Sequence, residues 1–281
     1  MKKLDRLDWA EGLTLCSFGV SAGVRVNVPG VLPHILPLLP PGWKKSRRVI
    51  VKRLYSLVVG RACERAGVRP LHVLYADNAR IARGAVLDQV LATLETDLHR
   101  YTAEATSDMT FLHAGVVGWQ GRAIVFPGRS LSGKTTLVRE MLRLGATYYS
   151  DEFAVVDDSG LVHPFARPLG IREDSSYAQT KYTAERLGAL SGSEPLPVGV
   201  VVISKYEAGT RWQPALLSHG QGALELLAHS IAVRSKPDDT LRRLQKLVGH
   251  SVFIQGTRGE AHEAAASILS LSCERKPLET V

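Results

Sequence analysis

An eight-residue run combines the residue types that bind phosphate groups. It fits the pattern Gly-x-x-x-x-Gly-Lys-Thr, and its residues are Gly128, Arg129, Ser130, Leu131, Ser132, Gly133, Lys134 and Thr135, with Thr136 directly after it. Glycines let the backbone bend until successive N–H groups point at an anion in front of a helix. The lysine then reaches the outer phosphates of a nucleoside triphosphate, and the threonine hydroxyl ligates Mg²⁺. A loop that only caps a helix would leave the run from Gly133 to Thr135 unexplained.

Two adjacent acids, Asp151 and Glu152, stand inside "YYSDEFAVVD", a stretch (148–157) whose aromatic and β-branched residues predict a strand. Acids are costly in a half-buried strand unless they have partners. They follow Lys134 by 17 and 18 residues, which is enough for one helix, one turn and one strand that returns to the loop. We therefore expect Mg²⁺ and a substrate hydroxyl as partners, with one carboxylate ligating the metal and the other taking a proton. The alternative is a strand end with two solvated acids.

The segments around these residues have the lengths that would bring the loop and the acids together. Strands are expected at 111–119 and 122–127, joined by a hairpin turn at Gln120 and Gly121. The second strand leads into the loop, and apolar residues at helical spacing predict a helix that begins at Lys134 and stops at Gly145. Further along we expect a turn at 157–160, a central strand at 198–206, helices at 222–233 and 237–248, a strand at 251–256 and a final helix from 259.

The N-terminal part of the chain predicts a small α/β unit without a motif for chemistry. We expect strands within 13–28, 47–59 and 70–77, and a helix at 84–106 with leucines along one side. Five prolines rule out a long helix in 29–43. We therefore expect two domains, an N-terminal α/β domain (1–107) and a C-terminal catalytic domain (108–281).

Composition limits the class of protein and its partners. The chain has 281 residues, 45% hydrophobic and 22% charged, with a formal net charge of +8, which suits a globular protein with an anionic ligand. No long Lys/Arg run alternates with aromatics, so no nucleic-acid partner is expected. Three scattered cysteines form neither a metal motif nor a disulfide framework, and no signal peptide or membrane span is recognisable, so we expect a cytoplasmic protein. A homo-oligomer stays open.

A family resemblance becomes visible once these motifs are placed in order. The segment "FLHAGVVGWQGRAIVFPGRSLSGKTTLVREMLRLGATYYSDEFAVVD", and more weakly "HPFARPLGIRE", resembles the bacterial HPr kinase/phosphorylases, and more closely the HPr-kinase-like proteins of unassigned substrate. The resemblance covers about Phe111 to Glu173, and the rest of the chain fits in layout only. It implies an α/β fold, with a phosphate-loop domain of the HPr-kinase and phosphoenolpyruvate-carboxykinase type after a small N-terminal α/β domain.

The resemblance also implies a role for each matching residue. Asp151 matches the catalytic acid/base that accepts the proton of a seryl hydroxyl, and Glu152 matches a second acid that supports metal or water. His113 matches an active-site histidine; without the resemblance it would be interpreted as a satisfied core histidine. The implied activity is Mg²⁺-dependent transfer of the γ-phosphoryl group of ATP, or of another nucleoside triphosphate, to a hydroxyl (serine) of a peptide or protein.

Two departures from the family pattern limit this expectation. Thr136 stands where HPr kinases have a glutamate, and "PLGIRE" stands after Arg167 where they have a second glycine-rich signature. Both argue against phosphorylase activity and against HPr as the substrate. An NTPase switch that positions water, and a non-catalytic nucleotide-binding module of a biosynthetic complex, remain alternatives.

Other charged residues give weaker signals. Arg167, Arg172 and Lys205 are candidate cations for a phosphate or an acidic substrate, although Arg167 is interpreted first as a surface charge. Three further histidines are scattered and predict no metal site; they are His163, His219 and His229.

Overall fold

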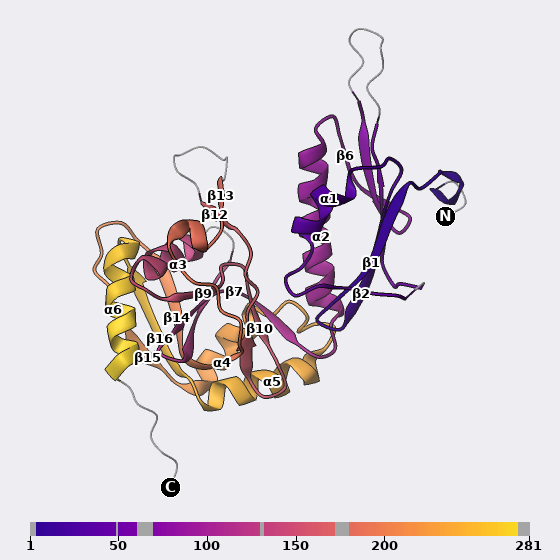
Figure 1. Ribbon diagram of the computed structural model, residues 1–281. Coiled ribbons are helices and arrows are strands. Elements are labelled where there is room, and N and C mark those ends of the chain that lie inside the picture. The colour runs from indigo at the N-terminus through magenta and orange to yellow at the C-terminus, as the bar shows by residue number, and fades with distance from the viewer. Residues whose placement is uncertain (1–3, 49, 61–69, 130–131, 172–179, 275–281) are drawn as a thin grey trace. The chain divides into compact units, whose positions relative to one another are not determined.

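The computed structural model describes residues 4–48, 50–60, 70–129, 132–171 and 180–274 and has a mixed α/β architecture (Figure 1). It divides into two compact units, Met1–Ser107 and Asp108–Val281. The α/β class expected from the sequence is thereby confirmed. Among the described helices, none is long and apolar enough to cross a membrane.

The first unit is a sheet with one long helix packed on it. Its strands lie in the order β3-β1-β2-β4-β5-β6, and only the pair β2–β4 is parallel. Leucines on one side of α2 (Leu87–Ala105) contact the buried side chains of the sheet. The other elements are η1 (Leu4–Arg6), β1 (Glu11–Ser17), β2 (Val20–Val26), α1 (Leu32–Ile35), η2 (Leu36–Leu38), β3 (Lys44–Lys45), β4 (Leu54–Val58), β5 (His72–Ala76) and β6 (Ala79–Gly84).

The second unit is built on a larger sheet. Its described strands follow the order β11-β10-β7-β8-β14-β16-β15, and β9 pairs with β7 beside β10. The elements are β7 (Thr110–Trp119), β8 (Arg122–Pro127), α3 (Lys134–Arg143), β9 (Thr147–Ser150), β10 (Phe153–Val156), β11 (Leu161–His163), β12 (Leu169–Ile171), β13 (Thr180–Tyr182), η3 (Glu185–Leu187), β14 (Leu196–Tyr206), β15 (Ala215–Leu217), α4 (His219–Ala228), α5 (Pro237–Gly249), β16 (Val252–Arg258) and α6 (Ala261–Glu274).

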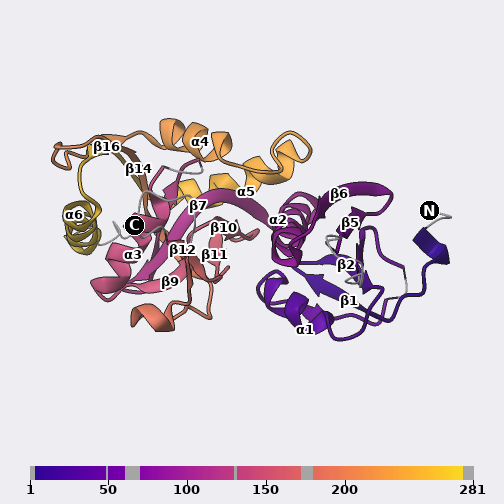
Figure 2. The ribbon, with the colours of Figure 1, turned by 90° about the horizontal axis from the view of Figure 1, so that it is seen from above.

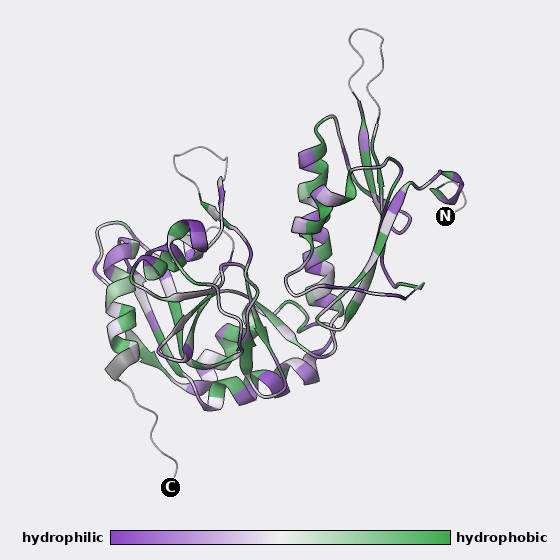
Figure 3. Cartoon of the chain, in the orientation of Figure 1, coloured by the Kyte–Doolittle hydropathy of each residue, from purple (hydrophilic) through white to green (hydrophobic). Residues whose placement is uncertain are grey.

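Helices cover both faces of this sheet (Figure 2). Side chains of α3 and α6 pack on one face, where they meet Ile124 and Val202. Side chains of α4 and α5 pack on the other, where they meet Val125 and Val201. Burial on both faces explains the continuous apolar run of β14. The alternation of green and purple along α2 and α5 in Figure 3 fits helices that bury one side only.

Three parallel strands bring loop ends to one edge of the sheet. β14 pairs in parallel with β8 on one side and with β16 on the other. The carboxyl ends of the three strands therefore lie at the same edge, where α/β proteins place their ligands. Strand β8 ends at Pro127, and the loop that follows it leads to α3. This helix begins at Lys134, as the sequence predicts. The hairpin turn before β8 is also confirmed: Gln120 and Gly121 have φ of 48° and 76°.

Three expected elements have different bounds. The stretch 148–157 is two strands, β9 and β10, with Asp151 and Glu152 in the break between them. The helix expected at 222–233 is α4, which begins earlier at a capping box of Ser218 and Gln221 and ends before 229. In the first unit, the strand expected at 47–59 is confined to β4, Leu54–Val58.

Candidate active site

The loop after β8 and the start of α3 hold Lys134 across the loop backbone. The Lys134 ammonium donates to the carbonyls of Gly128 and Arg129, at 2.7 and 2.8 Å. An ammonium has three N–H donors, so one donor remains beyond these two bonds. Burial lowers the pKa of Lys134, while the negative charges of Asp151 and Glu152 oppose this. The expected loop residues Ser130 and Leu131 lie outside the described residues.

One glycine of the loop is required by its backbone geometry. Gly133 has a φ of 82°, which L-residues with a side chain rarely adopt. A Cβ on Gly128 would lie 2.7 Å from the hydroxyl of Ser132, so that side chain would have to move. Thr136 follows in the first turn of α3 and is exposed. The main chain at Gly133 therefore has a conformation that most other residues would not adopt.

Thr135 and Asp151 meet at the beginning of α3. The Thr135 hydroxyl donates to Oδ2 of Asp151 at 2.9 Å. The hydroxyl of the buried Tyr148 lies 3.0 Å from Oδ1 of the same carboxyl and 2.8 Å from the carbonyl of Arg167. Burial raises the pKa of Asp151, and the bonds to Thr135 and Tyr148 counteract part of that effect. The return from loop to acid that the sequence predicts is thus present as a direct contact.

Glu152 faces a different partner. Its carboxylate pairs with the guanidinium of Arg167, whose side chain is 17% exposed against 38% for Glu152. The expectation that Arg167 is a surface charge is therefore wrong, because its side chain is mostly buried against Glu152. The N–H of Phe165 bonds to the carbonyl of Tyr149, so the segment that carries Arg167 runs beside β9. Arg172 lies outside the described residues.

A serine holds the break that carries both acids. The Oγ of the buried Ser150 accepts from the N–H groups of Glu152 and Phe153, at 3.1 and 2.9 Å. The carbonyl of Glu152 in turn accepts from the N–H of Ala114 on β7. These bonds satisfy the backbone without continuing the strand. The two side chains are thereby released from the strict in–out alternation of a strand, and can face different partners.

His113 lies on β7 opposite Phe153, and its imidazole packs on that ring with centroids 5.2 Å apart. The side chain is exposed, not the satisfied core histidine that the residues alone suggest. Its pKa is lowered by desolvation, then by Lys134 and His229. The structure thus brings His113 into the electrostatic surroundings of Lys134.

His229 is a site residue that the sequence did not reveal. Its carbonyl accepts from the N–H of His113 at 2.8 Å, because the chain after α4 runs antiparallel beside β7. Burial lowers the pKa of His229, Glu225 opposes this, and the charges of Lys134 and Arg129 lower it further. No local pattern distinguishes this histidine from the scattered ones, since only the pairing with β7 places it here.

Two further basic residues lie at or near the carboxyl ends of strands. Arg258, the last residue of β16, is 3% exposed and donates to carbonyls of the loop. No local pattern reveals it, because Arg258 falls between the strand expected at 251–256 and the helix expected from 259. Lys205 is exposed near the end of β14, in register with Thr257.

The oxygen ligands at the loop fit Mg²⁺. Mg²⁺ is commonly bound by one or two carboxylates together with substrate phosphates and water, and needs no all-protein cage. Thr135 offers a hydroxyl and Asp151 a carboxylate at this position. Within the described part of the chain, no group of three His, Cys, Asp or Glu residues is arranged to hold a metal. A site shared with a polyphosphate therefore suits these residues better than a closed metal site.

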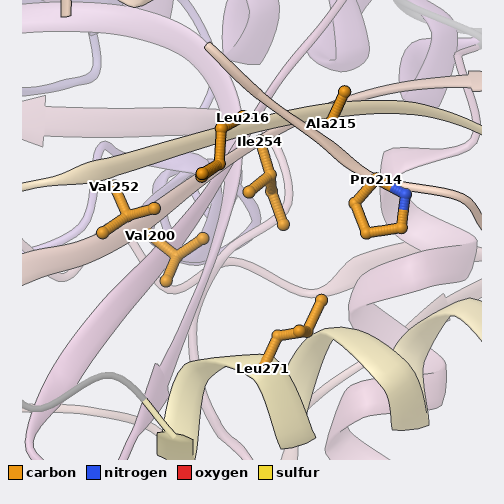
Figure 4. A pocket seen from close by; sticks show the side chains of 7 residues that line it. All are labelled: Val200, Pro214, Ala215, Leu216, Val252, Ile254 and Leu271. Atoms are coloured by element: carbon orange, nitrogen blue, oxygen red, sulfur yellow. The ribbon is translucent and has the colours of Figure 1, made fainter. Parts of the chain in front are cut away.

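A separate hollow lies between β14, β15, β16 and α6 (Figure 4). Its volume is about 130 Å³. Seven residues line it, and their side chains carry no polar atom: Val200, Pro214, Ala215, Leu216, Val252, Ile254 and Leu271. It offers nothing that would bind phosphate, and we do not assign it to the site at the loop.

Comparison with known proteins adds no assignment. No protein-family model matches the chain, and no curated protein matches it.

Proposed function

We propose that the second unit binds a Mg²⁺–nucleoside triphosphate, with ATP as the expected donor, and transfers its γ-phosphoryl group to a hydroxyl of a peptide or protein. The observation that carries the proposal is the hydrogen bond between Thr135 and Asp151. In phosphate-loop enzymes, Mg²⁺ is held by the Ser/Thr of the loop and by an acid at the end of a neighbouring strand. A loop that merely capped a helix would need no such acid.

The contacts support a division of roles between the acids that is the reverse of the one the family resemblance implies. Asp151 bonds to Thr135, so we assign it to the metal side. Glu152 is held by Arg167 and, among the described contacts, forms no bond to Thr135, so we assign it to the acceptor hydroxyl. When bound, Mg²⁺ neutralises charge on the phosphate oxygens. Glu152 would orient the hydroxyl and take its proton, while the ion pair with Arg167 holds the carboxylate in place.

Lys134 and His113 support the same proposal. Lys134 has a free donor for a phosphate oxygen beyond its bonds to Gly128 and Arg129. The pKa values of His113 and His229 are lowered, which favours the neutral imidazoles, and a neutral imidazole can both accept and donate a hydrogen bond. We propose further that the unit has the HPr-kinase and phosphoenolpyruvate-carboxykinase type of fold. The proposal is based on the order of its elements along the chain: the loop, then the helix, then the strand break that carries the acids.

Nucleotide binding tests the first half of the proposal. Titration calorimetry with Mg²⁺ and ATP should show binding to the wild type and at least ~10-fold weaker binding to Lys134→Ala, since a charged hydrogen bond to phosphate is lost. Lys246→Ala removes an exposed lysine from α5 and serves as the control. Equal affinity of Lys134→Ala and the wild type would remove the phosphate-loop assignment.

Product analysis tests the second half. Wild-type protein is incubated with ATP labelled in the γ-phosphate, Mg²⁺ and a library of serine-containing peptides, and labelled peptide is separated from free phosphate. Labelled peptide is the expected product. Release of free phosphate alone, at a rate that the peptides do not change, would instead identify an NTPase.

A further inference from the structure

Arg258 is a buried cation in an unusual setting. Its side chain is 3% exposed, and within the described part of the chain it forms no ion pair with a carboxylate. Its Nε is buried without a hydrogen-bond partner. Burial lowers the pKa of Arg258, against the influence of Tyr206 and Glu260. Burying a cation without a carboxylate partner costs free energy of folding. We therefore expect the Arg258 guanidinium to have a role that compensates for this cost.

The guanidinium is bonded to the phosphate-binding loop. Nη2 donates to the carbonyls of Ser132 and Gly133 at 3.4 and 3.2 Å, and Nη1 donates to the carbonyl of Gly259 at 3.3 Å. Nη2 also occupies the space in which a Cβ of Gly133 would lie. The side chain thus reaches from the carboxyl end of β16 to the loop that follows β8.

These two bonds bear on the direction in which the loop amides face. In a trans peptide, the C=O of one residue and the N–H of the next point in opposite directions. Arg258 binds the Ser132 carbonyl and shares the Gly133 carbonyl with the N–H of Leu137, so the N–H groups of Gly133 and Lys134 point away from the guanidinium. These are the amides at the N-terminus of α3, which have no acceptor within the helix. An anion in front of the helix would receive both.

The surroundings hold Arg258 in this position. The guanidinium lies 5.6 Å from the centre of the Tyr206 ring, and the Tyr206 hydroxyl donates to Glu260. The carbonyl of Arg258 accepts from the N–H of Glu207. A Cβ on Gly259 would collide with the carbonyl of Thr210, so the chain after Arg258 passes close to the turn at 207–210.

We infer that Arg258 is a positioning residue that holds the Ser132–Gly133 end of the phosphate-binding loop, so that the amides in front of α3 already face a nucleoside triphosphate when it binds. The inference rests on the proposed function for the identity of its ligand. Arg258 acts through the loop carbonyls and does not touch the phosphates. Its planar fork provides two directed donors, which a lysine ammonium would not reproduce.

The test compares Arg258→Met, Arg258→Lys and a control, Arg243→Met. Arg243 is also a buried arginine, 2% exposed, but it lies on α5 and bonds to Asp158. We expect Arg258→Met to weaken Mg²⁺–ATP binding roughly 10- to 100-fold and to raise KM with little change in kcat. Arg258→Lys should recover only part of the affinity, and Arg243→Met should bind as the wild type does.

A second measurement needs no nucleotide. ¹⁵N relaxation of the ligand-free protein gives order parameters for the Gly133 and Lys134 amides, which should fall from about 0.85 toward 0.6 in Arg258→Met and stay unchanged in Arg243→Met. Unchanged order parameters in Arg258→Met, or full affinity in Arg258→Lys, would overturn the inference. If the wild type binds no nucleotide, the proposed function fails, and the order parameters alone decide whether Arg258 orders the loop.

Discussion

Asp151 is a carboxyl whose surroundings oppose its own charge. Burial raises its pKa, and hydroxyl donors from Thr135 and Tyr148 compensate only in part. Folding therefore favours the protonated carboxyl. Stability from this group is present at low pH and is lost as pH rises through the raised pKa. At neutral pH the ionised carboxylate thus destabilises the metal-free protein, a cost that fits a ligand for a divalent cation.

Asp151→Asn should therefore raise the Tm of the metal-free protein at pH 7 and weaken Mg²⁺-dependent nucleotide binding. A gain of ~1 kcal/mol corresponds to about 2–4 °C for a domain of this size. Thermal unfolding in EDTA across the pH range measures this change in Tm, and the gain should shrink as pH falls toward the acid range, where the wild-type carboxyl is protonated.

Asp157→Asn is the control, for which we expect a change in Tm of the opposite sign. Burial tends to raise the pKa of Asp157, but the bond to His163 and two backbone N–H bonds lower it overall, so its loss should lower Tm. A lower Tm for Asp151→Asn would contradict the assignment.

Glu152→Gln should fail in another way. The amide cannot take a proton, so transfer to an acceptor hydroxyl should fall on the order of 10²- to 10⁴-fold. The Mg²⁺ concentration for half-maximal nucleotide binding should stay near the wild-type value, whereas Asp151→Asn should raise it. The measurement is Mg²⁺-dependent binding and turnover for both variants. A raised Mg²⁺ requirement in Glu152→Gln alone would restore the roles that the family resemblance implies.

At the scale of elements, the break between β9 and β10 sets the position of both acids. Ser150 closes this break with two backbone bonds, and β7 pairs with the strands on either side of it. The backbone that carries the acids is therefore held in part by a hydroxyl that bonds to two backbone N–H groups and, among the described contacts, to neither carboxylate.

Ser150→Ala should reduce turnover much more than stability. Loss of its two backbone bonds should cost about 1–3 kcal/mol of unfolding free energy, while the acids lose their fixed position and turnover falls by an order of magnitude or more. Ser251→Ala is the matched control, because Ser251 is also buried and bonds to two backbone carbonyls, of Leu247 and Val198. It should lower stability and keep turnover. Parallel losses in both variants would show that Ser150 has only a structural role.

Local patterns predicted the elements that depend on local causes. The turn at Gln120 and Gly121, the start of α3 at Lys134 and the helix α5 are set by turn geometry, glycines and helical spacing within a few residues. The break at Ser150 was missed, since a serine within a β-branched stretch does not reveal which N–H groups it will bind.

The positions of Arg167, His229 and Arg258 could not be predicted for a different reason. Each is placed by pairing between segments that are distant in sequence. The segment of Arg167 lies beside β9, that of His229 lies beside β7, and Arg258 ends the strand that pairs with β14. No window of sequence contains both partners. The lysine and acids were recognisable because the loop pattern and a short return path involve only one helix and one turn.

At the scale of the whole molecule, all assigned site residues belong to the second unit, which has buried clusters on both faces of its own sheet. Residues 108–281 expressed alone should therefore fold and bind Mg²⁺–ATP with an affinity within about three-fold of the full chain, because every residue that we assign to the phosphates lies in this unit. Calorimetry on both proteins measures this. A folded fragment that binds no nucleotide would show that the first unit contributes to the site.

The direction of the reaction is a second prediction for the whole protein. Thr136 stands where the family that the sequence resembles has a glutamate, and it is exposed on the first turn of α3, so for the proposed activity we expect forward transfer only. Phosphorylated acceptor incubated with inorganic phosphate and Mg²⁺ should yield no pyrophosphate, measured enzymatically. Formation of pyrophosphate would show that the missing glutamate is not required for phosphorolysis.

The strand break also has a consequence for how this protein can evolve. Its backbone is fixed by the Ser150 hydroxyl and by the N–H of Ala114, neither of which depends on the side chains at 151 and 152. Mutations at these two positions can therefore exchange the chemistry while leaving the pairing of β9 and β10 with β7 intact. If the proposed transfer to a hydroxyl is correct, the acceptor could change through positions 151 and 152 while the strand break itself is kept.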